Sequence, residues 1–467
     1  MSTSISASTP LDAATVRDPS LRGVQPKGLP VAQGLPVAGL GDASARLLGG
    51  PPGGERWIDH LARLGPLPKM GPDDITELIK AAGITGRGGG HFELWRKLDL
   101  ARRSPGSPLV VVNATEGEPA SAKDRTLLEL RPHLVLDGAA AIASAIGSTT
   151  VLVAVHVGSR SAMSTLAAIA ERQNHPADAA NAVGAQVGFH VVDVPDRYIA
   201  GESSSLASFL SGGEALPASK GRRSAESGID ERPTVVSNAE TVGHVGLIAR
   251  NGAAWFREAG SSDGPGSMLV TLAGDVSAPG SVVELMRPAT VADLAGWAAG
   301  ADRNWQAVLL GGYSGSWLSS GRATTTIVRP GRPNDGGASA GCGVFGVIDE
   351  DRCGLSEAAR LVRWLSDQRA GQCGACSYGL PLVADRMEAL AEGRVGGWFT
   401  NTRLASLAES LAGRGLCSLP DGTVSMAESA LDAFHDEVRL HRRRRCSASS
   451  PGGAFPLSRP SEREHWK

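Results

Sequence analysis

The chain has 467 residues, which is enough for two or three folded domains. Its formal net charge of −2 excludes a global field that would attract nucleic acid or an anionic membrane surface. Glycine accounts for 60 residues and aromatic residues for only 4%, so we expect a loop-rich fold with close backbone approaches.

The sequence carries no recognisable export or membrane signal. Its N-terminus lacks a charged segment followed by an apolar core, and no uninterrupted apolar run approaches the length of a membrane span. Six cysteines in a long chain without an export signal are typical of metal or redox ligands rather than of disulfides. We therefore expect a cytoplasmic protein without a transmembrane segment, which can still dock on a membrane partner.

The first part of the chain divides into an irregular segment and an α/β domain. Residues 1–60 are rich in Ser, Ala, Pro and Gly without clear periodicity, which predicts an irregular segment. Residues 61–260 alternate between helical and strand patterns, which predicts one α/β domain with a mainly parallel sheet and right-handed crossovers. The helices are expected at 73–82, 134–146 and 161–172, and the strands at 109–113, 150–156 and 190–194.

The second part of the chain predicts two further domains and a tail. Residues 265–335 predict a small domain with strands at 268–276 and 307–310 and a helix at 291–299. Residues 355–440 have apolar residues at helical spacing, which predicts a small helical bundle. Residues 441–467 form a basic, irregular tail, in which four consecutive arginines are typical of a solvated helix end rather than of a docking patch for an anion.

The most informative stretch is residues 83–92, in which five of ten residues are glycine. With so few side chains, backbone N–H groups can approach a ligand closely and form a concavity that binds anions. Arg87 adds a guanidinium that suits phosphate, and Lys97 follows on the next predicted helix. Taken alone, such a run is more often a flexible surface loop.

The neighbouring strand favours a binding site instead. The apolar run 109–113 is typical of a strand buried on both faces, and it ends in the polar cluster Asn-Ala-Thr-Glu-Gly-Glu-Pro of residues 113–119. A glycine-rich loop near the polar end of a buried strand is where α/β sheets place ligands.

These two stretches resemble the flavin- and NADH-binding 51 kDa-type subunit of respiratory complex I, a family that also includes subunits of soluble hydrogenases and formate dehydrogenases. The family's first motif is G-x-x-G-R-G-G-x-x-F followed by a lysine. Its second is N-A-D-E-G-E-P-x-x-x-K-D-R, in which Thr115 here replaces the aspartate. The residues that match the two motifs are Gly83, Gly86, Arg87, Gly88, Gly89, Phe92, Lys97, Asn113, Ala114, Glu116, Gly117, Glu118, Pro119, Lys123, Asp124 and Arg125.

Two shorter stretches extend the resemblance. Residues 198–206 resemble the family's Y-x-x-G-E-E-x-x-L, with Ser203 in place of the second glutamate. Residues 233–241 resemble P-T-x-V-N-N-x-E-T, with Ser237 in place of one asparagine. Taken alone, Glu202 is more often the acidic first residue of an ordinary strand-to-helix turn, and Asn238 and Glu240 are more often local caps. The departures reduce polar and acidic contacts around a flavin, so NADH specificity is less secure than flavin binding.

The resemblance implies a fold, two cofactors and a substrate. The fold is α/β: a Rossmann-like flavin domain, then a small β-grasp domain with a structural or docking role, then a helical bundle that carries a 4Fe–4S cluster. FMN is implied in the α/β domain, and NADH passes it a hydride with Glu118 and Phe92 on the nicotinamide side. The implied cofactor-binding residues are Gly86, Arg87, Gly88, Gly89, Gly90, Lys97, Asn113, Glu116, Tyr198, Gly201, Glu202 and Asn238.

The family's cluster motif is C-x-x-C-x-x-C with a fourth cysteine some forty residues on. Cys373 and Cys376 match the first two positions, Gly379 stands at the third, and Cys417 follows 41 residues after Cys376. Iron–sulfur clusters are normally held by four thiolates, and glycine offers no side-chain ligand. Among the remaining cysteines we expect Cys446 as the best substitute ligand.

Three interpretations of these cysteines remain open. The favoured one is a 4Fe–4S cluster with a substitute or non-protein fourth ligand, for which Cys353 is the second candidate after Cys446. The others are a vestigial site that binds nothing and a zinc site of three thiolates with one further ligand.

The sequence thus predicts an NADH dehydrogenase-like flavoprotein that passes electrons to a cluster and then to a partner. The partner class is another electron-transfer subunit or a ferredoxin-like acceptor, with no role for nucleic acid. Two alternatives remain: an FMN and iron–sulfur relay that uses a donor other than NADH, and a non-catalytic scaffold that retains the fold. Resemblance of fold alone does not decide between them.

Overall fold

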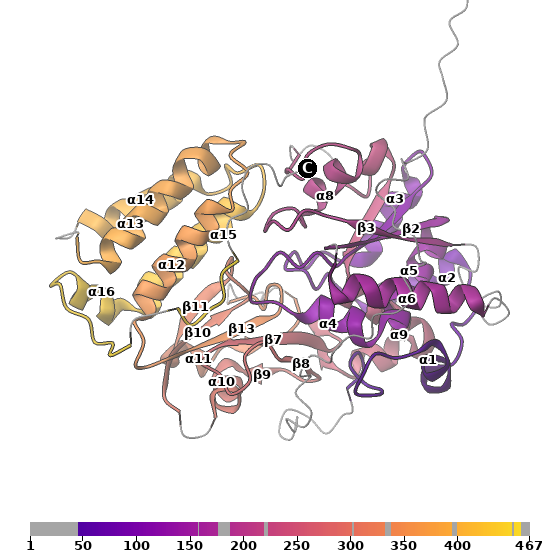
Figure 1. Cartoon of the computed structure of the whole chain (residues 1–467), viewed down its shortest axis with the longest axis horizontal. Coiled ribbons are helices and arrows are strands. Elements are labelled where there is room, and N and C mark those ends of the chain that lie inside the picture. Colours follow the sequence, from indigo (N-terminus) through magenta and orange to yellow (C-terminus); the bar gives the residue numbers. More distant parts are fainter. Residues whose placement is uncertain are drawn as a thin grey trace, which may run out of the picture.

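The structure is a computed structural model with three packed parts (Figure 1): an α/β unit, a mixed β-sheet and a helical unit. The irregular N-terminal segment expected from the sequence lies outside the described residues as far as residue 44, and helix α1 (Trp57–Leu64) begins before its expected end. The structure describes residues 45–156, 158–175, 187–218, 223–300, 303–331, 338–394, 399–450 and 453–458.

The α/β unit is built on a four-stranded parallel sheet in the order β3-β2-β1-β4. Its strands are β1 (Leu109–Asn113), β2 (Thr150–Val155), β3 (Gly188–Asp193) and β4 (Thr234–Asn238). The chain adds β2 and β3 on one side of β1 and then crosses to place β4 on the other side. The carboxyl ends of β1 and β4 therefore meet where the strand order reverses, which is where such sheets bind ligands.

Strand β1 is buried on both faces, as the continuous apolar run predicts. Val110 and Val112 face one core, which is covered by helices, whereas Leu109 and Val111 face a second core that extends into the mixed sheet and the helical unit. The helices of this unit, besides α1, are α2 (Pro72–Ala82), α3 (Leu94–Arg103), α4 (Lys123–Leu130), α5 (Pro132–Ile146), α6 (Arg160–Asn174), α8 (Ser203–Leu210) and α9 (Ala239–Arg257), with a short η1 (Ile229–Glu231).

Helices α5 and α9 cross at very close range on the helical face of the sheet. A Cβ atom at Gly138 of α5 would lie 1.8 Å from the carbonyl oxygen of Val242 in α9, so only glycine fits there. Gly246 of α9 faces the same crossing, 2.8 Å from the Leu134 carbonyl oxygen by the same measure. This crossing fixes α9, whose N-terminus follows directly from β4 at the ligand edge of the sheet.

The mixed sheet has five strands in the order β11-β10-β13-β7-β8. Its strands are β7 (Met268–Gly274), β8 (Val282–Leu285), β10 (Trp305–Leu310), β11 (Ser316–Ser319) and β13 (Val344–Asp349). The predicted range of this domain, 265–335, stops before β13, which is the central strand. The apolar run of β13 is interrupted by Gly346, where a Cβ atom would lie 2.2 Å from the ring of Phe455. The shorter elements are β5 (Gly260–Ser261), β6 (Gly264–Pro265), β9 (Ala289–Thr290), α10 (Val291–Ala299), α11 (Ser320–Ala323) and β12 (Ile327–Val328).

The helical unit packs beside this sheet. Its elements are α12 (Gly354–Asp367), a π-turn η2 (Ala375–Gly379), α13 (Leu380–Ala391), α14 (Phe399–Leu411), α15 (Leu419–Ala433) and α16 (His435–His441). Helix α15 ends at Phe434, whose ring packs against Trp317 of the mixed sheet, and α16 begins directly after it. Among the described residues, no helix has both the length and the apolar character needed to cross a membrane.

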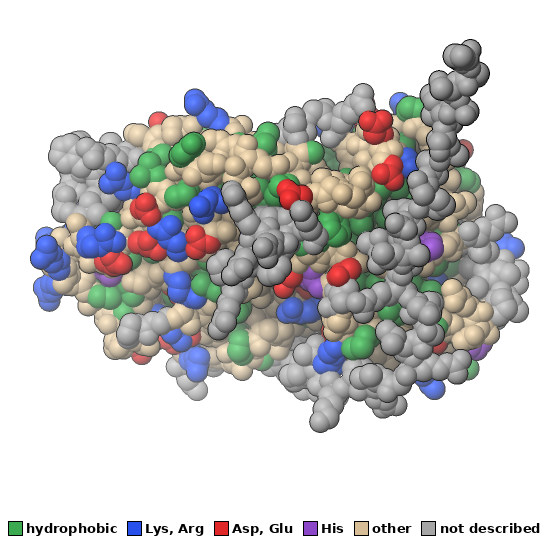
Figure 2. All heavy atoms as spheres, turned by 45° about the horizontal axis from the view of Figure 1, so that its top comes forward, with side chains coloured by type: hydrophobic (Ala, Val, Ile, Leu, Met, Phe, Trp, Pro, Cys, Tyr) green, Lys and Arg blue, Asp and Glu red, His purple; other side chains and the backbone are tan. Residues whose placement is uncertain are grey.

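The described residues of the C-terminal tail, 442–450 and 453–458, form no helix, and some of them are at least partly buried. Phe455 lies in the core against Tyr313 and Trp317, and the Trp364 indole N–H donates to the Ser458 carbonyl at 2.8 Å. In contrast, the three arginines 443–445 are exposed, as expected for a solvated helix end. Basic and acidic side chains mix over the helical unit at the left of Figure 2, so the surface there has no single sign.

Candidate functional site

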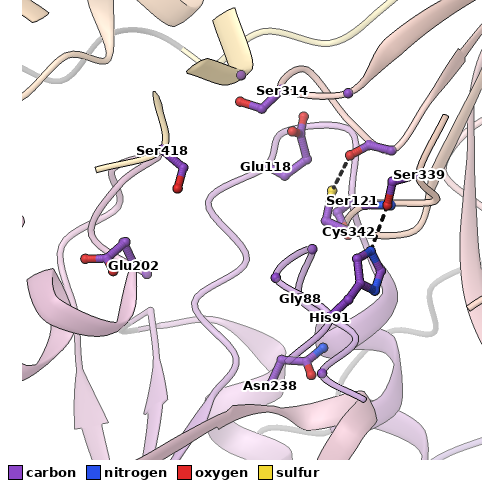
Figure 3. A pocket seen from close by; sticks show the side chains of 18 of the residues that line it. Gly88, His91, Glu118, Ser121, Glu202, Asn238, Ser314, Ser339, Cys342 and Ser418 are labelled. Carbon is purple, nitrogen blue, oxygen red and sulfur yellow. Dashed lines mark hydrogen bonds between the residues drawn. The ribbon is translucent and has the colours of Figure 1, made fainter. Parts of the chain in front are cut away.

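A cavity of about 1080 Å³ lies where the three parts of the molecule meet. The α/β unit supplies the glycine-rich loop, the segment after β1 and the loop before α8; the mixed sheet supplies the loops around Gly311 and Gly341. The helical unit supplies the start of α15, including Cys417 and Ser418. Figure 3 shows side chains from all three parts pointing into this space.

The glycine-rich loop lies on the cavity wall between α2 and α3. Gly86, Gly88, Gly89 and Gly90 all line the cavity. A Cβ atom at Gly88 would make only ordinary contacts, 3.7 Å from the Asn238 Cβ atom, and at Gly90 it would meet nothing within 4 Å. The loop therefore offers open backbone to a ligand, as an anion-binding concavity requires.

The structure corrects the expectation for Arg87. Its guanidinium is buried and donates to the carbonyl oxygens of Pro265 at 2.7 Å and Ser267 at 3.4 Å, on the side away from the cavity. Burial lowers the pKa of this side chain to about 10. Arg87 therefore ties the loop to the segment before β7, and its side chain is absent from the cavity lining.

Lys97 is the cation of the first motif that does face the cavity. Its ammonium donates to the Val236 carbonyl oxygen at 2.9 Å, and burial lowers its pKa to about 8. A buried ammonium bonded to a carbonyl is stabilised further by an anion. Lys97 is thus suited to hold a phosphate beside the glycine-rich loop.

In the segment after β1, several polar side chains that line the cavity also make hydrogen bonds within the protein. Glu116, at a φ of 44°, accepts the backbone N–H of Asp124 at 3.0 Å and of Arg125 at 3.1 Å, so its carboxylate caps α4. Asn113 donates to the Gly201 carbonyl at 2.6 Å, and its side-chain oxygen accepts the Thr115 hydroxyl at 2.9 Å. Thr115, which stands in place of the aspartate of the family motif, therefore makes a hydrogen bond to Asn113 but supplies no carboxylate.

Glu118 is a buried acid of the cavity with a strongly raised pKa. One carboxylate oxygen accepts the Tyr313 N–H at 2.9 Å, while the other is buried with no hydrogen-bond partner among the described residues. Burial raises the pKa of this carboxyl group to about 7. An acid near neutral pKa in a cavity is a candidate for proton or substrate binding.

A pH-dependent stability follows from Glu118. Because its folded pKa is near 7 and the usual value is 4.5, the folded state binds more protons over that interval, so the free energy of unfolding falls as pH rises through it. The expected loss is about 3 kcal/mol between about pH 5 and about pH 8. Urea unfolding of flavin-free wild type and Glu118→Gln at both pH values measures it. Equal pH slopes in the two proteins would contradict the assignment.

The remaining predicted residues lie on the same wall. Tyr198 bonds the Ser314 hydroxyl at 2.8 Å, and Phe92 lines the cavity with the Arg223 guanidinium 5.1 Å from its ring centroid. Glu202 and Asn238 line it too, but both are also N-caps: Glu202 accepts the Ser204 N–H at 2.9 Å and Asn238 the Thr241 N–H at 3.3 Å. Helix capping by these two residues is therefore part of their role here.

The sequence did not indicate that loops of the mixed sheet contribute residues to the cavity. His91, at a φ of 48°, bonds Ser339 at 2.8 Å (Figure 3), and Cys342 donates to the Gly311 carbonyl at 3.3 Å beside Glu118. Gly312 allows this approach, since a Cβ atom there would lie 2.7 Å from a Glu118 oxygen. The only signal in the sequence is the clustering of glycines at 311–312 and 341–343.

The three motif cysteines belong to one packed core of the helical unit, in which Cys376 and Cys417 are buried and Cys373 is partly buried. The Cys376 N–H donates to the Cys373 carbonyl oxygen at 3.0 Å. Burial raises the pKa of Cys376 and raises that of Cys417 to about 11. Cys417 also lines the cavity, so the thiols adjoin the space that the glycine-rich loop faces.

At the position of the missing thiol, the structure holds a hydrocarbon side chain. A Cβ atom at Gly379 would lie 2.4 Å from the Leu411 Cδ2 atom. Leu411 is buried, so its methyl groups occupy the place that a cysteine at this position would need. The donor set therefore fits a cluster through three thiolates of the motif and offers no fourth thiol from residue 379.

The structure also corrects the expected substitutes for that thiol. Cys353 lies 3.3 Å from the His441 Nε2 atom, and Cys446 lies 3.6 Å from a Glu437 oxygen. These side chains form a separate group in which all the ligand atoms lie within 4.8 Å of one another. In the structure the neighbours of Cys353 and Cys446 are therefore His441 and Glu437.

Two family models match parts of the chain. Residues 79–246 match the family model of the Nuo51 FMN-binding domain, and residues 356–441 match that of the NADH-ubiquinone oxidoreductase-F iron-sulfur binding region. An F-type subunit of NADH-quinone oxidoreductase from Rhizobium meliloti (strain 1021) is 32% identical over 386 residues, which are 80% of this chain and 90% of the relative. The NADP-reducing hydrogenase subunit HndC of Solidesulfovibrio fructosivorans is 28% identical over 388 residues, 80% of this chain and 76% of the relative.

A solved structure has the same fold over most of the chain. A chain of NAD+-reducing NiFe hydrogenase in the H2-reduced state superposes with a TM-score of 0.70 at 26% identity. The match covers 79% of this chain and 62% of the hydrogenase chain, so this chain spans less than two thirds of that hydrogenase chain.

Proposed function

Because the chain belongs to the family of F-type subunits of NADH-quinone oxidoreductase, we propose that it is a flavin-dependent oxidoreductase that oxidises NADH and delivers electrons through an iron–sulfur centre to a partner protein. The observation that carries the proposal is the shared cavity. One continuous space is lined by the open glycine-rich loop, Lys97, Glu118 and Cys417. Electron transfer from a flavin to an iron–sulfur centre needs the two sites to lie close together, and here both proposed sites adjoin the same cavity.

The fit of FMN rests on the groups that the cavity offers. Lys97 supplies a buried ammonium for the phosphate, and Gly88 to Gly90 supply backbone without side-chain bulk. Asn113, Tyr198, Gly201 and the caps Glu116, Glu202 and Asn238 bound the rest of the proposed site. When bound, FMN supplies hydride acceptance and single-electron release, and the protein supplies binding and orientation.

The proposed nicotinamide side is formed by Glu118 and Phe92. Phe92 offers an aromatic face at the cavity wall, and the unpartnered Glu118 oxygen offers an acceptor for a substrate N–H or O–H group. With a pKa near 7, Glu118 can hold a proton at that oxygen near neutral pH. The three thiols of Cys373, Cys376 and Cys417 are proposed to hold the iron–sulfur centre.

The partner is proposed to be another electron-carrying subunit, as the names of the relatives indicate multi-subunit assemblies. The mixed sheet is proposed as the β-grasp module between the flavin domain and the cluster domain. The cytoplasmic location and the ferredoxin-like acceptor remain predictions from the sequence.

An anaerobic NADH titration tests the proposal. Adding NADH to flavin-loaded protein is expected to bleach the flavin absorbance band, with turnover when an artificial acceptor is present. The alternative favoured by Thr115 and Ser203 is a relay with another donor, because both replace acidic residues of the family motifs at the cavity wall. Reduction by dithionite without reduction by NADH or NADPH would support that relay and contradict NADH oxidation.

A further inference from the structure

Four side chains that take no part in the proposed electron path come together where α12, α16 and the following tail pack against one another. They are Cys353 at the start of α12, Glu437 and His441 on α16, and Cys446 in the following tail. One ligand atom of each lies within 4.8 Å of those of the others, and three of the four side chains are buried. We infer that these residues form a structural zinc site, distinct from the motif cysteines.

The distances between the ligand atoms match a tetrahedral metal site. Cys353 Sγ lies 3.3 Å from His441 Nε2, His441 Nε2 lies 3.4 Å from a Glu437 oxygen, and Cys446 Sγ lies 3.6 Å from the same oxygen. Zinc bonds of about 2.3 Å to sulfur and about 2.0–2.1 Å to nitrogen and oxygen give tetrahedral edges of roughly 3.3–3.8 Å. These three distances are close to the edges of a zinc tetrahedron, and the remaining pairs of ligand atoms lie within 4.8 Å of one another.

The histidine is oriented as a metal ligand. His441 Nδ1 lies 2.5 Å from the Ala391 carbonyl oxygen, which can only accept a hydrogen bond. The proton of a neutral ring is therefore on Nδ1, and the lone pair of Nε2 points toward Cys353 and Glu437. Ligating histidines commonly have this second hydrogen bond, which fixes both tautomer and ring orientation.

The other ligands are also held in place by neighbours. The Ser356 N–H and hydroxyl group both approach Cys353 Sγ, at 3.4 Å and 3.1 Å, from the first turn of α12. The Ser447 hydroxyl donates to the Glu437 Oε1 atom, which leaves Oε2 facing the cysteine and histidine ligands. Donors at a helix N-terminus favour a thiolate, which is the form that binds metal.

The donor set selects zinc among the common cations. Two thiolates, an imidazole and a carboxylate suit zinc, whereas calcium and magnesium prefer oxygen ligands alone. Zinc with two thiolates and one carboxylate leaves one net negative charge, and four arginines immediately precede Cys446. A zinc ion at this site would hold α12 together with α16 and the tail, which follow the end of α15 at Phe434.

Metal analysis of the full-length protein tests this site. We expect about one zinc per chain in wild type, and at least about a tenfold lower content in Cys446→Ser and His441→Gln, since even indirect partners of metal ligands contribute that much. Cys446 is exposed, so its replacement leaves the fold intact. His435→Gln is the matched control, because His435 is exposed on the same helix and is expected to keep the zinc.

Iron measured in the same samples separates this site from the motif cysteines. Cys373→Ser is expected to lower iron and leave zinc unchanged, so loss of the proposed iron–sulfur centre would not remove the zinc. Cobalt added to reduced, metal-free wild type is expected to give the visible bands of a tetrahedral thiolate complex, and Cys446→Ser should lack them. The inference is overturned if reduced wild type takes up neither zinc nor cobalt, or if peptide mapping finds Cys353 and Cys446 joined as a disulfide.

Discussion

Gly88→Val protein is expected to bind FMN roughly 100-fold more weakly than wild type, or to be purified without it. The new side chain would project from the glycine-rich loop into the cavity that the flavin needs. Filling a close-packed site with extra methyl groups costs about 1–3 kcal/mol, and each 1.4 kcal/mol is about tenfold in affinity. Flavin released by heating and measured by chromatography gives the retained fraction, and fluorescence titration gives the dissociation constant.

This substitution tests binding rather than folding. Gly88 does not have a left-handed backbone, and a Cβ atom there would make only ordinary contacts. Gly53→Val is the matched control, because Gly53 is exposed in another loop with nothing within 4 Å of its Cβ position. If Gly88→Val retains flavin as wild type does, FMN does not bind against this loop.

Cys376→Ser is expected to abolish the electron paramagnetic resonance signal of a reduced cluster after anaerobic reconstitution. Cys376 is the most buried of the three motif cysteines, and its replacement leaves two thiolates from the motif. With three thiolates, one iron of the wild-type cluster lacks a thiolate from the motif and should be lost on oxidation, which gives a three-iron species. Wild type that binds no iron after reconstitution would mean that the site is vestigial.

Restoring the missing thiol provides the complementary test. Gly379→Cys alone places a Cβ atom 2.4 Å from Leu411, so it should destabilise the helical unit without a better cluster. Gly379→Cys combined with Leu411→Ala removes that clash and offers a fourth thiolate. The double variant is expected to resist the oxidative loss of iron, and Leu411→Ala alone controls for the cavity. A double variant as labile as wild type would show that residue 379 does not face the cluster.

The sequence by itself determined the class of the fold and the location of the site. Runs such as 109–113 specify a strand buried on both faces, and Gly83 and Gly147 end α2 and α5 in a left-handed conformation. The motif residues Lys97, Glu118 and Cys417 all reach one cavity, as the resemblance implied. These features depend on the backbone preferences of a few neighbouring residues, or on motifs long enough to identify a family.

Only the tertiary structure decided where individual side chains point. Arg87 has the same local sequence whether it faces a phosphate or the carbonyl groups of Pro265 and Ser267, and that choice is made by a segment almost 180 residues away. The positions of Cys353 and Cys446 in the chain favour the cluster, yet the packing of α12 against α16 and the tail places them beside His441 and Glu437. Contacts between distant segments depend on how whole elements pack, and no local pattern of residues encodes that packing.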